Sequence, residues 1–170
     1  MATIHFIVGL PCSGKTTFAK KLEKSEKALL LSPDDWQIRI FDNNLYGFSE
    51  AENIQHSLYH DRIEAIMWDV AVRMIALGVD VILDFGFWSK VERDMFRAKA
   101  KKIGASAAFH YMDVSIETLL HRLEKRNAAG ANETIIFPKE HLEEWYESFE
   151  PPTKQELRED TKAYKPKEEQ

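Results

Sequence analysis

The stretch Gly9–Thr16, which reads GLPCSGKT, decides the fold of this chain. It matches the pattern G-x-x-x-x-G-K-[ST] at every specified position. Gly9 and Gly14 allow backbone conformations that are closed to residues with a Cβ, so the loop can turn its N–H groups toward an anion. Because the apolar run Ile4–Val8 precedes this stretch and a helical run follows it, we predict a strand, a phosphate-binding loop and a helix in succession.

The residues of this loop predict a binding site for a nucleoside triphosphate. Lys15 is expected to reach the β- and γ-phosphates, and the Thr16 hydroxyl is expected to bind Mg²⁺. Cys12 is interpreted as a small residue that fills space rather than as a redox centre. The predicted binding residues are Gly9, Pro11, Cys12, Ser13, Gly14, Lys15, Thr16 and Thr17. The expected cofactors are ATP and Mg²⁺, although nothing in the loop selects ATP over GTP.

Further apolar runs predict the rest of a sheet. They are short, continuous and rich in Val, Ile, Leu and Phe, which is typical of strands covered on both faces of a parallel sheet. The expected strands are Ile4–Val8, Ala28–Leu31, Val79–Leu83 and Ala107–Met112. The expected helices are Lys15–Lys24, Pro33–Phe41, Glu50–Leu77, Ser89–Ile103, Ser115–Ala128 and Lys139–Phe149. This alternation predicts a three-layer α/β fold, with a parallel sheet of roughly four to five strands between two layers of helices.

Composition and charge limit the function classes. The chain has 170 residues and a formal net charge of -5, which argues against a broad nucleic-acid surface because such surfaces are basic. Residues 1–152 are predicted to form one domain, and the charged segment 153–170 is predicted to be a mobile tail. A single cysteine, no long apolar run and no signal-peptide pattern lead us to expect a cytoplasmic protein without a membrane partner.

Carboxylates follow two of the predicted strands. Asp34 and Asp35 come soon after Ala28–Leu31, and Asp84 directly follows Val79–Leu83. Both positions lie at the carboxyl edge of the sheet, where α/β proteins bind ligands. Asp34 is expected to accept a proton from the acceptor hydroxyl, and Asp84 to hold Mg²⁺ through water or to bind that hydroxyl. The alternative is that all three only cap backbone amides or favour the start of a helix.

Arg122 and Arg126 are one helical turn apart and therefore project from the same face of their helix. Such a pair can belong to a lid that closes over the phosphates and neutralises the charge that builds in the transition state. We expect a lid over about residues 122–137, with both arginines in catalytic roles. A solvated helix face is the alternative.

The acceptor pocket is expected to come from the middle of the chain, where aromatic residues alternate with polar ones and would suit a ring-bearing acceptor. His56 and His60 are one turn apart, but no third ligand follows, so a solvated or hydrogen-bonded face is favoured over a metal site. The candidate pocket residues are Asp34, Asp35, Arg39, Tyr46, Phe48, Tyr59, Arg62, Asp84, Phe87 and Trp88.

The chain resembles the small P-loop kinases grouped with polynucleotide 5′-hydroxyl kinase, zeta toxin and chloramphenicol phosphotransferase. The resemblance rests on Gly9–Thr17, Ser32–Trp36, Val81–Trp88 and Leu119–Arg126. It implies the P-loop nucleoside-triphosphate hydrolase fold, and it implies that Asp34 is the base that activates the acceptor hydroxyl. Polynucleotide kinases carry an arginine shortly after that aspartate, whereas the nearest arginine here is Arg39, which disfavours a nucleic-acid acceptor.

Together these features predict an ATP-dependent phosphotransferase that moves the γ-phosphate to a hydroxyl of a small molecule such as an antibiotic, a nucleoside or a sugar. Two alternatives stay open at this point. One is a polynucleotide 5′-hydroxyl kinase. The other is a nucleotide-dependent switch that only hydrolyses, although the Asn-Lys-x-Asp element of GTPases is absent from the sequence. The oligomeric state is left open.

Overall fold

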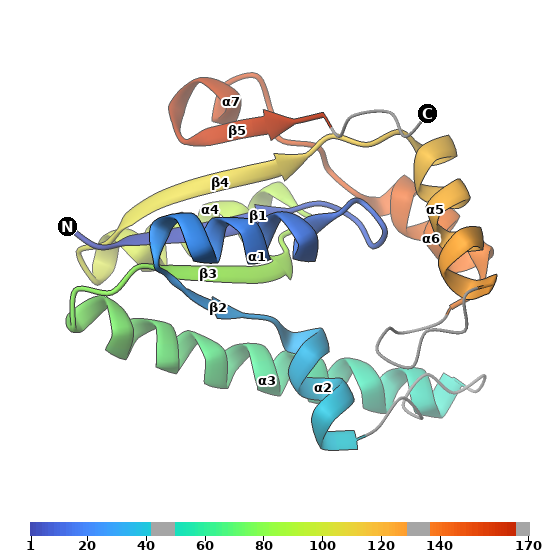
Figure 1. Cartoon of the computed structure of the whole chain (residues 1–170), viewed down its shortest axis with the longest axis horizontal. Helices are drawn as coiled ribbons and strands as arrows, with labels where there is room; N and C mark the ends of the chain where they lie inside the picture. Colours follow the sequence, from blue (N-terminus) through green and yellow to red (C-terminus); the bar gives the residue numbers. More distant parts are fainter. Residues whose placement is uncertain (42–49, 129–136, 166–170) are drawn as a thin grey trace.

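Strand β1 (Thr3–Val8) lies at the centre of a parallel sheet (Figure 1). The computed structural model describes residues 1–41, 50–128 and 137–165. Over these ranges the sheet has five strands in the order β2-β3-β1-β4-β5, and every neighbouring pair runs parallel. The other strands are β2 (Leu29–Leu31), β3 (Val81–Gly86), β4 (Ser106–Met112) and β5 (Thr161–Tyr164). The predicted α/β fold is therefore confirmed.

Helices follow the strands and cover both faces of the sheet. They are α1 (Lys15–Glu26), α2 (Pro33–Phe41), α3 (Glu50–Ala76), α4 (Lys90–Lys102), α5 (Ile116–Ala128), α6 (Lys139–Ser148) and α7 (Glu156–Glu159). In Figure 1, α1 crosses in front of the sheet, α4 lies behind it and α3 runs along its lower side. Within the described ranges, no helix combines the length and the apolar character needed to cross a membrane.

The alternation of side chains along β1 explains the three layers. Ile4, Phe6 and Val8 are buried in a core shared with α3 and α4, whereas Ile7 is buried in a second cluster that includes Ala19 of α1. Burying each of the larger apolar side chains stabilises the fold by about 1.5–3 kcal/mol. Both faces of β1 are thus apolar, which is why the strand reads as a continuous apolar run rather than as an alternating one.

The C-terminal segment differs from the prediction. A tail separate from the domain was expected from residue 153, but β5 pairs in parallel with β4 and completes one edge of the sheet. Thr161 at the start of β5 is buried. The strand escaped prediction because TKAY is short and mostly polar, so it carries no apolar run and only a brief alternation.

A buried ion pair holds this segment against α4. Arg93 is fully buried, and its Nε donates a hydrogen bond to Glu156 Oε1 at 2.8 Å. Its Nη1 donates to the carbonyl oxygens of Phe87 at 3.1 Å and Glu150 at 2.9 Å. Burial alone would raise the pKa of Glu156, but hydrogen bonds from Arg93, the Thr153 N–H and Arg97 hold it at about 2. The segment after residue 150 is therefore fixed by charge as well as by strand pairing.

Replacing Glu156 with alanine should destabilise the protein strongly, because Arg93 would then be buried without its carboxylate. Removing one partner of a buried pair typically costs about 3–5 kcal/mol. Urea unfolding of Glu156→Ala measures this loss. Glu159→Ala is the matched control, because Glu159 is exposed and on the same short helix, and it should change stability by less than about 1 kcal/mol. Equal unfolding midpoints for the two variants would contradict the role of the pair.

A row of three polar side chains, His5, His110 and Tyr164, lies on the α1 face of the sheet. His5 Nδ1 lies 3.0 Å from His110 Nε2, and His110 Nδ1 lies 3.1 Å from the Tyr164 hydroxyl, so β1, β4 and β5 are joined in one hydrogen-bonded row. The Phe18 ring of α1 covers it, 5.3 Å from the His110 ring. Burial, with a contribution from the nearby His5 and Lys162, lowers the pKa of His110 to about 4.

This row should make the protein less stable as the pH falls below about 6.5. In that range the unfolded chain protonates His110 whereas the folded protein does not until about pH 4, so the unfolded state binds more protons and stability decreases with falling pH. Between pH 7 and pH 5 the wild type should lose about 2 kcal/mol that His110→Phe does not lose. Urea unfolding at several pH values measures the difference. The exposed His121→Gln control should keep the wild-type slope, and an equal slope in His110→Phe would contradict the assignment.

Candidate functional site

The phosphate-binding loop joins β1 to α1 as predicted. Gly9 has φ 146° and Gly14 has φ 92°, both in the region that favours glycine. A Cβ at Gly9 would lie 3.0 Å from Ser13 Oγ and 3.2 Å from Met112 Cβ, so no larger residue fits there. The Gly9 N–H donates a hydrogen bond to the Gly86 carbonyl at 2.9 Å. The loop is thereby tied to the end of β3.

Cys12 adopts a left-handed conformation in this loop, with φ 64°. Burial raises the pKa of its thiol, and the positive charges of Arg126, Lys15 and Arg122 oppose that rise only in part. The thiol is therefore the stable form at neutral pH, and thiols are far less reactive than thiolates. This agrees with the interpretation of Cys12 as a space-filling residue.

Lys15, Thr16 and Asp84 lie together where the loop meets β3. The Lys15 amine donates a hydrogen bond to the Leu10 carbonyl at 3.0 Å, and Thr16 Oγ1 donates to Asp84 Oδ2 at 2.8 Å. Asp84 was expected after the third strand, but β3 continues through it to Gly86 and buries it. Burial is the main cause that raises the pKa of Asp84; Asp34 and Asp35 add to the rise, while Lys15 and Thr16 oppose it.

The surroundings of Asp84 fit a divalent cation. Its Oδ1 atom is buried and has no hydrogen-bond partner among the described residues, although a buried carboxylate oxygen is costly without one. A hydroxyl and a carboxylate beside the phosphate site are the oxygen ligands that Mg²⁺ prefers. Thr16 and Asp84 are therefore suited to hold Mg²⁺, and their role as its ligands stays a prediction.

A cavity of about 570 Å³ opens beside the loop, and we call it the Asp34 cavity. Six of the predicted site residues line it, namely Pro11, Lys15, Asp34, Asp84, Phe87 and Trp88. They come from the loop, from the first turn of α2 and from the end of β3. The structure thus brings together, around one space, a cation for the phosphates, the predicted base and the predicted metal ligand.

Other candidates lie elsewhere. Arg39, Arg62 and Asp35 are exposed and are not among the described residues that line the Asp34 cavity, although Asp35 is close enough to influence the pKa of Asp84. Tyr59 stacks on Phe41, with ring centroids 4.5 Å apart, and so packs α3 against α2. Two more candidates, Tyr46 and Phe48, lie outside the described residues, as does the side chain of His56.

One face of α3 contributes residues that the sequence reasoning did not assign to the acceptor pocket. Ser57, His60, Asp61 and Glu64 line the cavity at intervals of three and four residues. His60 Nε2 lies 3.9 Å from Asp34 Oδ1, and His60 Nδ1 lies 3.5 Å from Glu64 Oε1. The signal that could have found them is the set of polar residues at helical spacing on one face of α3.

A sharp turn after β3 places Trp88 in the wall of the cavity. Gly86 has φ 99° and Phe87 has φ 47°, a left-handed pair that reverses the chain. A Cβ at Gly86 would lie 2.6 Å from Trp88 Nε1, so the indole packs directly against the glycine. Phe87 is buried against Phe96 at 5.0 Å between ring centroids. The strained conformation is thus held by packing, a pattern that recurs at functional sites.

Arg122 and Arg126 both lie beside the loop. Arg122 Nη1 donates hydrogen bonds to the Cys12 and Ser13 carbonyl oxygens, each at 3.3 Å. The Arg126 guanidinium stands 4.9 Å from the centre of the Phe137 ring. Residues 122–128 of the predicted lid belong to α5, and residues 129–136 lie outside the described residues.

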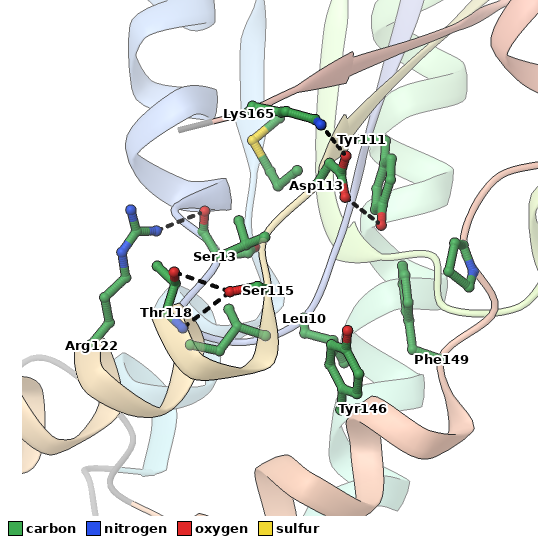
Figure 2. Close-up of a pocket in the computed structure, with 14 residues that line it drawn as sticks. Leu10, Ser13, Tyr111, Asp113, Ser115, Thr118, Arg122, Tyr146, Phe149 and Lys165 are labelled. Carbon is green, nitrogen blue, oxygen red and sulfur yellow. Dashed lines mark hydrogen bonds and ion pairs between the residues drawn. The ribbon is translucent and has the colours of Figure 1, made fainter. Parts of the chain in front are cut away.

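A second cavity, of about 690 Å³, lies on another side of the loop (Figure 2). Its walls come from the ends of β4 and β5, from the start of α5 and from the segment around Tyr146 and Phe149. Figure 2 shows Arg122 reaching toward Ser13 on one side and these two aromatic residues on the other. Lys15, Asp34 and Asp84 line the Asp34 cavity and not this one, whereas the predicted site residues Ser13 and Arg122 line this one.

Comparison with known families now bears on this geometry. A family model described as "AAA domain" matches residues 4–152. The chain belongs to the AAA domain family. This agrees with the resemblance to small P-loop kinases, because the match contains both the loop and the strand that carries Asp84. A search of curated proteins found no match.

Solved structures share the fold of this AAA domain protein. A putative kinase from Chloroflexus aurantiacus has a TM-score of 0.73 at 18% identity, covering 96% of this chain and 88% of that one. Chaetomium thermophilum Kti12, in complex with ADP-AlF3, has a TM-score of 0.68 at 20% identity, covering 96% and 88%. A gluconokinase from Sinorhizobium meliloti has a TM-score of 0.63 at 18% identity, covering 96% and 82%. At these identities the likeness concerns the fold.

Gly86→Ala should disturb the cavity wall, because the added Cβ would collide with Trp88 at a position where φ is already unfavourable for alanine. Gly104→Ala is the matched control: it also has a positive φ, 72°, but a Cβ there meets nothing within 4 Å. We expect Gly104→Ala to lose about 1 kcal/mol and Gly86→Ala to lose at least about 1 kcal/mol more. Urea unfolding and tryptophan fluorescence measure both effects. Equal losses and unchanged fluorescence in the two variants would contradict this packing.

Proposed function

We propose that this AAA domain protein is an ATP-dependent phosphotransferase that moves the γ-phosphate of ATP to a hydroxyl group of a small molecule. The observation that carries the proposal is the convergence of Lys15, Asp34 and Asp84 on one cavity beside the phosphate-binding loop. A protein that only bound a nucleotide would need the loop, but it would not need an accessible carboxylate facing a space large enough for a second substrate.

The loop and the start of α1 would hold the phosphates. Backbone N–H groups of the loop and the positive end of the α1 dipole favour an anion there. Lys15 carries the charge that can neutralise the γ-phosphoryl group as its bond to the leaving oxygen lengthens. Thr16 and Asp84 would hold Mg²⁺, which when bound neutralises the β- and γ-phosphate oxygens. Arg122 and Arg126 lie close enough to the loop to add positive charge when the donor is bound.

Asp34 is the proposed general base. Its side chain is 62% exposed, so the carboxylate is open to a substrate that enters the cavity. The acceptor hydroxyl would give its proton to Asp34 while its oxygen bonds to the γ-phosphorus. The bond from that phosphorus to the bridging oxygen would break, and the nucleoside diphosphate would leave with the electron pair. Of the remaining predicted acceptor contacts, Trp88 lines the cavity, whereas Asp35, Arg39 and Arg62 do not.

Asp34→Asn tests the proposal. Removing the base should lower phosphoryl transfer at least about 10²-fold, because general-base catalysis typically contributes 10²–10⁴-fold. ATP affinity should stay within about twofold. The assay follows label from γ-labelled ATP into a panel of aminoglycosides, nucleosides, sugars, phenicols and an oligonucleotide with a free 5′-hydroxyl. Asp69→Asn serves as the control, because Asp69 is exposed on α3 and does not line the cavity.

The panel separates this proposal from its alternatives. Label that enters only the oligonucleotide would favour a polynucleotide 5′-hydroxyl kinase. Release of inorganic phosphate without any labelled acceptor, at a rate that Asp34→Asn does not change, would favour a hydrolysing switch. Either result would overturn the small-molecule phosphotransferase.

A further inference from the structure

We propose that the acceptor is a cation, namely a small hydroxyl-bearing compound with one or more ammonium groups, such as an amino sugar or an aminocyclitol. This inference rests on the proposed function and names the substrate class of the same cavity. It is carried by three features of the Asp34 cavity: the sign of its charge, the small number of cations among its described lining residues, and its aromatic wall.

The charge of the cavity is strongly one-sided. Among the described residues that line it there are six carboxylates and a single lysine, with no arginine. The lysine is Lys15, which faces the phosphate site and would be matched there by the donor. The acidic residues come from four different helices and one strand, so their convergence is a property of the fold and not of one acidic run. They are Asp34, Asp61, Glu64, Asp84, Glu92 and Glu144.

The deeper carboxylates face the cavity with few partners of opposite charge. The Glu64 side chain is only 20% exposed, and His60 Nδ1 lies 3.5 Å from its Oε1 atom. Burial is the main cause that raises the pKa of Glu64 to about 8; the carboxylates of Glu92, Asp61 and Asp34 contribute to the rise, and Lys99 opposes it. An ammonium group placed between these side chains would supply the positive charge and the hydrogen-bond donors that they lack.

Aromatic rings complete the wall. Trp88, after β3, and Trp145, on α6, both line the cavity, with ring centroids 5.7 Å apart and planes inclined at 53°. His141 lies 5.7 Å from Trp145 and also faces the cavity. Indole faces attract ammonium groups through their quadrupole, most strongly where water is displaced. They also stack on the apolar face of a sugar or cyclitol ring, so the same wall suits both parts of such an acceptor.

Negatively charged acceptors are disfavoured by the same features. A sugar acid, a nucleotide or a nucleic-acid end would bring its own charge against these carboxylates, and the described residues that line the cavity include no arginine to pair with it. The acidic wall therefore determines selectivity: it attracts amines and repels anions that could otherwise bind near the phosphate-binding loop.

Binding of a polyamino sugar tests the inference directly. Neamine and its fully N-acetylated form have the same hydroxyl groups but differ in charge. Calorimetric titrations in 50 mM salt, with a non-hydrolysable ATP analogue and Mg²⁺ present, should show neamine binding at least about tenfold more tightly. Raising the salt to 500 mM should remove most of that difference, because exposed charges are then screened.

Two variants locate the effect. Asp61→Asn and Glu144→Gln face the cavity from α3 and α6, and together they should weaken neamine binding at least about tenfold while leaving the N-acetylated form unchanged. Glu143→Gln is the matched control, because Glu143 is the neighbour of Glu144 on α6 but does not line the cavity, and it should bind neamine like the wild type. Equal affinity for the two forms, or an equal loss in the control, would overturn the inference.

The transfer assay keeps this inference separate from the proposed function. If the protein phosphorylates neutral or anionic acceptors in preference to amines, the phosphotransferase stands and the cationic acceptor is wrong. If amines bind with the expected dependence on charge but no acceptor is phosphorylated, the binding site stands and the phosphotransferase is wrong.

Discussion

The parallel pairing of β1 with β3 is the constraint on which the rest of the site depends. Phe6 pairs with Leu83, and after an irregularity Val8 pairs with Gly86, so both strands end at the same edge of the sheet. From that register, Gly9 can donate to the Gly86 carbonyl and Thr16 to Asp84. If the register slipped by one residue, Asp84 would point to the opposite face of the sheet. The phosphate-binding loop and the predicted metal ligand would then be separated.

The same edge is supported from the C-terminal side. The Glu150 N–H donates to the Trp88 carbonyl at 3.0 Å, and the Lys90 N–H donates to Glu150 Oε2 at 2.7 Å. The segment that carries Trp88 is therefore held between the strained turn after β3 and the chain that leads to α7. Since Arg93 binds the Phe87 and Glu150 carbonyl oxygens as well as Glu156, one buried guanidinium organises both sides of this junction. The cavity wall is thus rigid although it lies at the end of a loop.

The sequence predicts most of the donor half of the site and little of the acceptor half. The loop is recognisable because its chemistry needs a fixed local pattern, and the four apolar strands are recognisable because both of their faces are buried. The acceptor half depends on residues far apart in sequence. Asp61 on α3 and Glu144 on α6 meet only through tertiary packing, and neither belongs to a local motif. For the same reason Arg39 and Arg62, close to Asp34 and His60 in sequence, do not line the cavity.

The fifth strand and its ion pair escaped prediction for a related reason. Charged residues after position 152 resemble a solvated tail, and only the fold shows that Glu156 is buried opposite Arg93. Nothing in the local pattern around either residue indicates such a partner. Buried charge pairs of this kind are specified by the complete structure rather than by a segment.

The long sequence separation between Arg93 and Glu156 also affects the order in which the chain folds. Arg93 and Glu156 are 63 residues apart, so during synthesis the guanidinium can acquire its carboxylate only after the intervening chain has been made. Synthesis releases the N-terminal part of a chain first. Arg93 of α4 would therefore lack its carboxylate partner until the C-terminal segment has been made. Docking of α4 and closure of the β4 edge should therefore occur as a single late step. The half of the molecule that carries the phosphate-binding loop can assemble early, but the wall of the Asp34 cavity that contains Trp88 is completed last.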